Sequence, residues 1–214
     1  MQIPLGLALL SVLATALAIV GRTRGPPWLH FLGKPLILPP LAAAAFLVPS
    51  LLPDSARGFL AAALALAWLG DIALMFRRGF VPGLLSFLLA HVAYLICFCV
   101  EAQGSWALGW LVPLLPLGYF ALRGVLGRVG RLKLPIVLYA SILTLVAWRL
   151  LARVERLEEL GVRSCVLGVV GGLLSILADS LLVRRRFAEA KVPYWLELGS
   201  YAGSQLCIVG ATLG

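Results

Sequence analysis

Two aspartates lie inside apolar stretches of this 214-residue chain. Asp71 lies in the run from 58 to 76, and Asp179 in the run from 163 to 183. An ionisable side chain within a membrane-spanning helix costs ~2.5–3.5 kcal/mol even on lenient insertion scales, so it is usually kept for a function. In such surroundings the ionised carboxyl is disfavoured, and two neighbouring carboxyls tend to share a proton. A pair of this kind supplies an acid and a base at neutral pH.

Further polar side chains occur in the same runs at helical spacing. His91 and Tyr94 are three residues apart and therefore share one helix face. Glu197, Tyr201 and Gln205 follow one another at intervals of four residues and share a face in the same way. The polar residues that we expect around one central cavity are His91, Tyr94, Tyr139, Glu197, Tyr201 and Gln205. The alternative is that these groups form ordinary hydrogen bonds between helices. A ridge of small residues, Gly168, Gly172 and Ser175, leads to Asp179 and would let another helix approach closely.

Other reaction mechanisms fit the residues poorly. The two histidines, His30 and His91, are too few for a three-histidine zinc site. The sequence has no G-x-S-x-G elbow, no Walker-type phosphate loop and no C-x-x-C pair among its four cysteines. The two aspartates with His91 and Glu197 could hold a divalent metal through oxygen ligands, which is an alternative; we assign no metal and no cofactor.

Composition indicates the environment in which these residues act. Of the residues, 62% are hydrophobic and 13% are charged, and the mean hydropathy is +1.02. Soluble domains are about 45–50% apolar and about 25% charged, so a soluble protein is excluded. The net charge of +9 fits basic loops facing anionic lipid rather than a nucleic-acid partner. We therefore predict an integral membrane protein.

The pattern of apolar runs predicts an all-α fold, a polytopic membrane bundle of about eight helices in one domain, 1–214. The predicted spans are 3–20, 35–52, 58–76, 80–100, 105–121, 134–152, 163–183 and 194–213. The first is interpreted as a retained helix because no basic segment precedes it. Four prolines in the second span and two in the fifth predict kinks, which lipid tolerates only where neighbours cover the freed backbone groups.

The basic residues predict the orientation. Thirteen of the 18 lysines and arginines lie in the first, third, fifth and seventh connections, so these connections should be cytoplasmic and both termini outside. Asp71 and Asp179 then lie within about 10 Å of the cytoplasmic side. The segments Leu69–Met75 and Leu177–Val183, each followed by arginines, are similar. They suggest a parallel internal repeat, although chance similarity of apolar segments is an alternative.

Several of these residues together resemble a known family. The residues are Gly70-Asp71, Phe80-Val81-Pro82-Gly83, Ala90 to Tyr94, Leu134-Pro135 to Tyr139, Ala178-Asp179 and Tyr201 to Gln205. In order and spacing they are similar to the YhhN-type lysoplasmalogenases, over about 34–205. Ala178 departs from the serine that the family often has there. The resemblance implies an eight-span membrane enzyme that hydrolyses the vinyl ether of lysoplasmalogens to a fatty aldehyde and a glycerophospho-base.

The resemblance places the family's two aspartates at Asp71 and Asp179, as acid and base in an order that the sequence leaves open. His91, Tyr94, Tyr139, Tyr201 and Gln205 would then hold water or glycerol oxygens and set the carboxyl protonation. Lys34 and Arg77, with Arg184 as a further candidate, lie at the predicted headgroup level, where they could pair with the phosphate of the lysophospholipid substrate. Their alternative role is ordinary anchoring by positive charge.

Two other functions compete with this hypothesis. Intramembrane aspartates and histidine, with proline-broken helices, also suit a proton-coupled transporter or a lipid carrier. A membrane hydrolase of another lipid bond is the third possibility, because two carboxyls are not tied to one substrate.

Overall fold

The computed structural model describes residues 3–102 and 106–214, and most of these residues are helical. The only β pairing in the described ranges is an isolated bridge between Ser50 and Leu213. The α-helices are α1 (Leu5–Thr23), α2 (Pro27–Gly33), α3 (Pro39–Leu47), α4 (Asp54–Leu74), α5 (Phe80–Glu101), α6 (Leu114–Leu122), α7 (Lys133–Ala152), α8 (Leu157–Phe187) and α9 (Tyr194–Ala211). Short 3₁₀ turns are η1 (Lys34–Leu36), η2 (Leu108–Leu111), η3 (Gly130–Leu132) and η4 (Arg153–Arg156). The predicted all-α class is confirmed.

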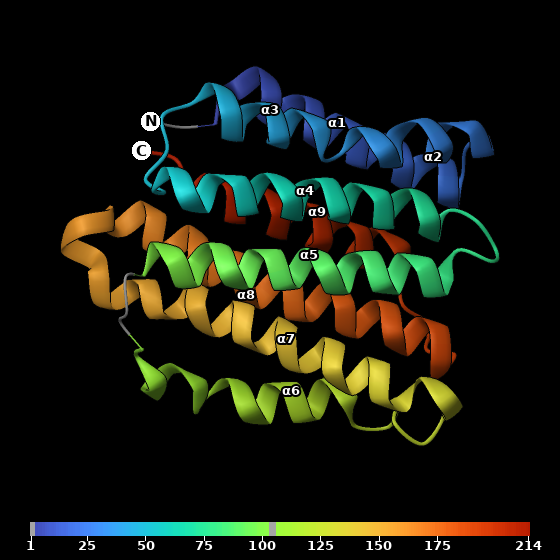
Figure 1. The fold of residues 1–214 in the computed structure, drawn as a ribbon. Helices are drawn as coiled ribbons and strands as arrows, with labels where there is room; N and C mark the ends of the chain where they lie inside the picture. The colour runs from blue at the N-terminus through green and yellow to red at the C-terminus, as the bar shows by residue number, and fades with distance from the viewer. Residues whose placement is uncertain (1–2, 103–105) are drawn as a thin grey trace.

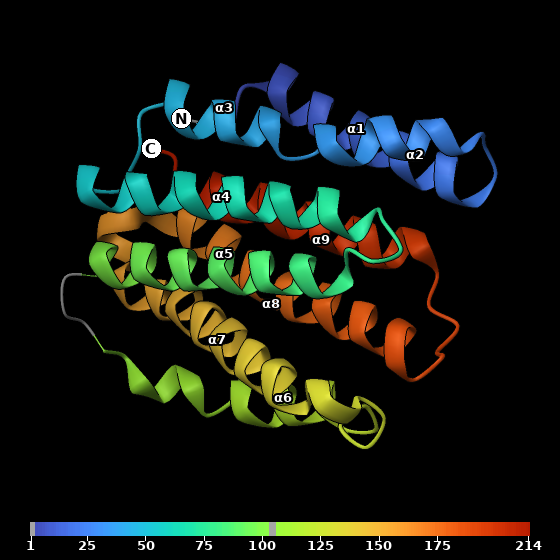
Figure 2. The ribbon, with the colours of Figure 1, turned by 45° about the vertical axis from the view of Figure 1, so that its right-hand side comes forward.

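The helices form a bundle whose axes run roughly along one direction (Figures 1 and 2). Helix α4 packs along α5, and α8 packs along α9, so each aspartate-bearing helix pairs with the helix that follows it. Helices α1 to α3 cover one side of these pairs, and α7 lies beside α5 and α8. Helix α6 lies on the far side of the bundle, against α7 and α8.

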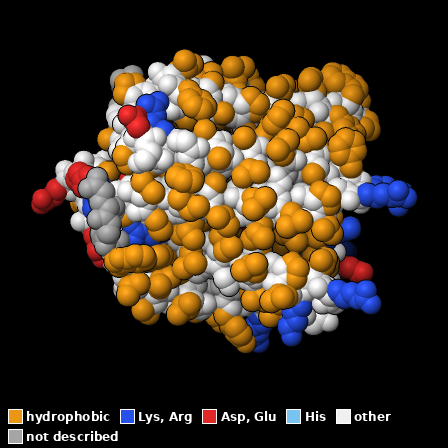
Figure 3. All heavy atoms as spheres, viewed as in Figure 1, with side chains coloured by type: hydrophobic (Ala, Val, Ile, Leu, Met, Phe, Trp, Pro, Cys, Tyr) orange, Lys and Arg blue, Asp and Glu red, His pale blue; other side chains and the backbone are white. Residues whose placement is uncertain are grey.

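The exterior of the bundle is apolar and its interior carries polar groups. Large hydrophobic side chains are exposed along the outer faces, with Leu47 at 75% and Leu134 at 76%. Figure 3 shows this apolar surface, with charged side chains gathered toward the two ends. By contrast, Asp71, His91 and Gln205 are buried. Such a distribution suits a bundle surrounded by hydrocarbon and not by water, as in a polytopic membrane protein.

The number of membrane spans remains a prediction. Length and hydropathy alone select five segments of the described chain, 5–23, 27–47, 54–74, 80–101 and 130–187. The last of these contains both α7 and α8. The predicted fifth span corresponds to η2 and α6, and residue 105, where we expected it to begin, lies outside the described residues. The orientation of the termini is likewise still a prediction.

The predicted irregularity of the second span is confirmed. The predicted span 35–52 contains the end of η1 and all of α3, with Pro35 inside η1 and Pro39 beginning α3, and the separate helix α2 precedes it. Neighbouring helices satisfy the carbonyl groups that the break frees. Ser11 Oγ of α1 donates to the Ile37 carbonyl at 2.8 Å, and Trp68 Nε1 of α4 donates to the Pro35 carbonyl at 2.8 Å.

The connections carrying most of the basic residues all lie at one end of the bundle, at the right of Figure 1, and the termini lie at the other. We refer to the first as the basic end. Near the opposite end, Arg153 is buried and forms an ion pair with the buried Glu101. Its guanidinium also donates to Ser164 Oγ at 2.5 Å and to the Ala211 carbonyl at 2.6 Å. This cluster joins α5, α8 and α9 where the termini meet.

Candidate active site

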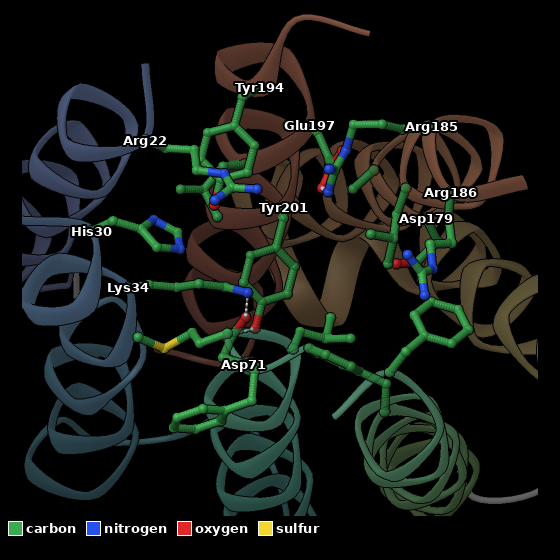
Figure 4. A pocket seen from close by; sticks show the side chains of 18 of the residues that line it. Arg22, His30, Lys34, Asp71, Asp179, Arg185, Arg186, Tyr194, Glu197 and Tyr201 are labelled. Atoms are coloured by element: carbon green, nitrogen blue, oxygen red, sulfur yellow. Dashed lines mark hydrogen bonds and ion pairs between the residues drawn. The ribbon is translucent and has the colours of Figure 1, made fainter. Parts of the chain in front are cut away.

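A cavity of about 310 Å³ lies near the basic end of the bundle, and Asp71 and Asp179 are both on its wall. Its lining comes from α1, α2, η1, α4, α5, α8 and α9. In Figure 4, Lys34 and Tyr201 converge on Asp71, and Asp179 lies on another wall, toward Arg186. The structure therefore brings together two carboxyls that are more than 100 residues apart in the chain.

Asp71, at the end of α4, is held by two donors. The Lys34 ammonium lies 3.4 Å from Oδ1, and the Tyr201 hydroxyl donates to Oδ2 at 2.6 Å. The residue is only 2% exposed. A buried charge is tolerated when it is paired and hydrogen-bonded. Both oxygens of Asp71 are thus engaged by donors from other elements.

The position of Lys34 differs from the sequence-based expectation. We expected this side chain at the headgroup level, facing the substrate phosphate. The structure instead buries it beside Asp71, although it still lines the cavity. Two features place it there: the helix is interrupted at η1, and Gly33 packs closely against α1. A Cβ on Gly33 would lie 2.6 Å from backbone atoms of α1. Only glycine allows this approach, and it sets the depth of Lys34.

Asp179, in α8, has a different set of neighbours. The Tyr139 hydroxyl donates to its Oδ2 at 2.7 Å, and Nε2 of His91 lies 3.8 Å from the same oxygen. The other ring nitrogen of His91, Nδ1, is 2.7 Å from the Phe87 carbonyl. A carbonyl can only accept, so Nδ1 carries a hydrogen and a neutral ring presents an unprotonated Nε2 to Asp179. The His91 ring is therefore oriented toward Asp179, although the 3.8 Å separation is too long for a direct hydrogen bond.

Close helix packing fixes the geometry around both aspartates. A Cβ on Gly70 would lie 2.7 Å from the Phe87 ring, so α5 can approach α4 beside Asp71 only because residue 70 is glycine. Phe87 in turn packs edge-on against the ring of Tyr201. The predicted small-residue ridge of α8 is also in contact with α7, because Gly172 faces the Ala147 backbone. Both carboxyls thus stand on rigid, closely packed helices.

Some predicted residues lie away from the cavity. Tyr94 donates a 2.6 Å hydrogen bond to Gln205, and both side chains are buried in the core between α5 and α9. These two satisfy each other, so a single cavity lined by every polar face, as the spacing suggested, is wrong. His91 and Tyr139 reach Asp179 without lining the cavity itself.

The rim of the cavity is basic. Arg77 is exposed and lines it, as expected, but Arg184 does not; its guanidinium donates to the Phe120 carbonyl at 2.7 Å. Its neighbours Arg185 and Arg186 line the cavity instead. Arg185 is paired with Glu197, which leaves three rim arginines without a carboxylate partner among the described residues. These are Arg22, Arg77 and Arg186.

Two aromatic residues of the cavity were missed at the sequence level. His30 binds the Ala18 carbonyl through Nδ1 at 3.2 Å, and its ring packs edge-on against Tyr194. Both line the cavity. His30 stands in an apolar, proline-rich segment with no polar residue at helical spacing. No sequence signal distinguished it from a histidine of the packed core.

The donor set does not form a recognisable metal centre. Within residues 3–102 and 106–214, no group of three or more His, Cys, Asp and Glu side chains is arranged to hold a metal ion. The cationic partners of Asp71 and Glu197 occupy the oxygens that a metal would need. The site is instead a pair of carboxyls with tyrosine, histidine and lysine neighbours.

A helical bundle with an apolar exterior, and with two carboxyls on the wall of one internal cavity, is the architecture of a polytopic membrane protein. The chain belongs to the YhhN family, whose family model matches residues 29–212. This match covers the whole of the cavity except Arg22 and confirms the resemblance suggested by the sequence motifs. Comparisons with curated proteins and with solved structures give no match.

Proposed function

We propose that this protein hydrolyses the vinyl ether bond of lysoplasmalogens, releasing a fatty aldehyde and a glycerophospho-base. The observation that carries the proposal is the shared cavity of Asp71 and Asp179, in which each carboxyl accepts a hydrogen bond from a tyrosine of another helix. Vinyl ether cleavage needs a positioned acid, a nearby negative charge and one activated water. Two carboxyls at one cavity supply all three, much as in glycosidases.

The different neighbours of the two aspartates support distinct roles. Asp71, paired with the Lys34 ammonium, is the carboxylate that acts as the base. Asp179, which has the His91 ring and no lysine or arginine partner among the described residues, is the general acid. Different neighbours are a common way to divide acid and base work between two carboxyls.

The reaction then proceeds in three balanced steps. Asp179 donates its proton to the β-carbon of the vinyl ether, and the α-carbon and oxygen become an oxocarbenium ion facing the Asp71 carboxylate. Asp71 accepts a proton from water as the water oxygen bonds to the α-carbon, which gives a hemiacetal. The hemiacetal hydroxyl then gives its proton to the Asp179 carboxylate, and Asp71 gives its proton to the glycerol oxygen. The carbon–oxygen bond to glycerol breaks in this step, which releases the aldehyde.

The basic rim supports an anionic substrate. Arg22, Arg77 and Arg186 face the cavity without carboxylate partners among the described residues. Guanidinium groups bind phosphate through paired hydrogen bonds. A phosphate on the rim would hold the glycerol backbone at the mouth of the cavity and the ether bond further inside, toward the two aspartates.

The test is aldehyde release by the purified protein in detergent. We expect turnover of 1-alkenyl lysophosphatidylethanolamine or lysophosphatidylcholine, and none of the matched saturated alkyl ether, which cannot be protonated at carbon. Asp71→Asn and Asp179→Asn should each abolish turnover while the extracted protein keeps its elution profile and helical content. Near-normal activity of either variant would overturn the assignment. A transporter would show no aldehyde release in detergent, where no sealed compartment exists.

A further inference from the structure

A second, apolar groove opens from the other side of Asp179. It lies between α6, α7 and α8, and Asp179 and Tyr139 form part of its wall. The rest of the lining is largely apolar and includes Gly118, Ala121, Ala140, Leu143, Ile176 and Val183. Asp179 therefore borders two different spaces, the larger cavity with its basic rim and mixed polar and apolar lining, and this apolar groove.

A single-chain lysophospholipid changes polarity at the same point along its length. Its phosphate and glycerol lie on one side of the ether bond, and an unbranched hydrocarbon chain lies on the other. Building on the proposed function, we infer that the groove between α6, α7 and α8 binds the first carbons of the alkenyl chain. Asp179, at the junction of the two spaces, then faces the β-carbon. This carbon lies on the chain side of the vinyl ether and is the one that accepts the proton.

The groove is narrow, with room for a short stretch of hydrocarbon but not for a headgroup. Its volume is about 30 Å³, against about 310 Å³ for the larger cavity. Narrow, apolar lining gives hydrocarbon good contact and offers a phosphate no charged partner. The larger cavity, by contrast, carries several charged residues on its wall.

The groove also reaches the outer surface of the bundle. Gly118, Ala121 and Ala140 are half-buried, and neighbouring side chains of α6, such as Leu115 and Phe120, are exposed on the apolar exterior. A long chain can therefore leave the groove beside α6 and continue into the surrounding hydrocarbon. No wide tunnel through the bundle is needed.

Gly118 controls the width of the groove. A Cβ at this position would lie 3.3 Å from Thr144 Oγ1 on α7, with no other atom within 4 Å. A larger side chain at residue 118 should thus fill the groove without striking the backbone of a neighbouring helix. Ala121, one turn further along α6, offers a second position for the same change.

The first test compares chain-length profiles. With alkenyl lysophospholipids of 2 to 18 carbons, Gly118→Leu and Ala121→Leu should lower kcat/KM at least about tenfold for every chain long enough to enter the groove, and leave the shortest almost unchanged. Gly58→Leu is the matched control, since Gly58 is exposed at the far end of α4 with nothing within 4 Å of a Cβ. Superimposable profiles for wild type and both groove variants would overturn the groove assignment while leaving the proposed activity intact.

The second test does not require turnover. A saturated ether lysophosphatidylcholine with a photoreactive diazirine near its first few methylenes should label peptides of α6 and α7, and excess unlabelled lysolipid should suppress the labelling. Gly118→Leu should reduce it severalfold, and Gly58→Leu should not. Labelling confined to other helices, or unaffected by competitor, would overturn the inference. Competed labelling of α6 in a protein with no aldehyde release would sustain the groove and reject the hydrolase.

Discussion

The hydroxyl of Tyr201 donates a 2.6 Å hydrogen bond to Oδ2 of Asp71, across 130 residues of sequence. The tyrosine is on α9 and the aspartate is on α4. Tyr139 of α7 makes the corresponding bond to Asp179 of α8 at 2.7 Å. Each carboxyl is thus oriented by a neighbouring helix and cannot rotate freely on its own.

Removing either tyrosine hydroxyl should impair catalysis more than binding. Tyr201→Phe and Tyr139→Phe keep the ring packing but leave one carboxyl oxygen without its donor. We expect kcat to fall about 10- to 100-fold, the usual effect of losing a partner that orients a reacting group, with little change in KM. Steady-state aldehyde release measures both constants. Tyr119→Phe, at an exposed site on α6, is the matched control; an equal loss there would point to a general effect of losing a hydroxyl.

Lys34→Met should test whether Lys34 serves Asp71 or the substrate phosphate. Without the ammonium, the buried Asp71 loses the charge that keeps it ionised, so kcat should fall about 100-fold or more, and Lys34→Arg should recover part of it. The loss should be equal on 1-alkenyl glycerol, which has no phosphate. Lys191→Met, an exposed change near the same end, should have no effect. A rise in KM restricted to phosphate-bearing substrates would instead restore the headgroup role expected from the sequence.

Arg77→Gln and Arg186→Gln should weaken substrate binding. Both side chains line the cavity rim, so each change removes a charged donor to phosphate, and KM for lysoplasmalogen should rise about tenfold with kcat nearly constant. Kinetics on 1-alkenyl glycerol should be unchanged. Arg78→Gln is the matched control, because Arg78 is adjacent and exposed but does not line the cavity. If Arg78→Gln raised KM as much as Arg77→Gln, the rim arginines would act through their overall positive charge and not through direct contact with the phosphate.

The cluster around Arg153 should govern stability rather than activity. Arg153→Met leaves Glu101 buried without its cation, which typically costs about 3–5 kcal/mol. The double variant Glu101→Leu/Arg153→Met removes both charges and should recover most of that loss. Thermal unfolding in detergent, followed by circular dichroism, compares the two. A single variant that is as stable as the wild type would show that the ion pair contributes little to holding this end together.

The sequence predicts the two aspartates and the helical bundle for a clear physical reason. A carboxyl inside an apolar run is costly, so Asp71 and Asp179 stand out without any knowledge of their partners. Contacts between helices are harder to predict. Helical spacing places Tyr94 and Tyr201 equally near the expected cavity, yet Tyr94 is bonded to Gln205 in the core and only Tyr201 reaches Asp71.

Residues in irregular segments were the least predictable. Lys34 lies where a helix is interrupted, so counting residues along an ideal span gives the wrong depth for its ammonium group. Glu197 was expected at the central cavity, but its pairing with Arg185 depends on the connection between α8 and α9, which has no regular geometry. Single-helix periodicity carries no information about such pairs.

The interruption between α2 and α3 has a consequence for how the site responds to its substrate. Prolines remove the amide groups that a continuous helix would require, and side chains of α1 and α4 already bind the carbonyls left over. The segment accordingly has no straighter alternative into which it could relax. The ammonium beside Asp71 is therefore in position before any lipid arrives, and binding energy need not be spent on assembling it.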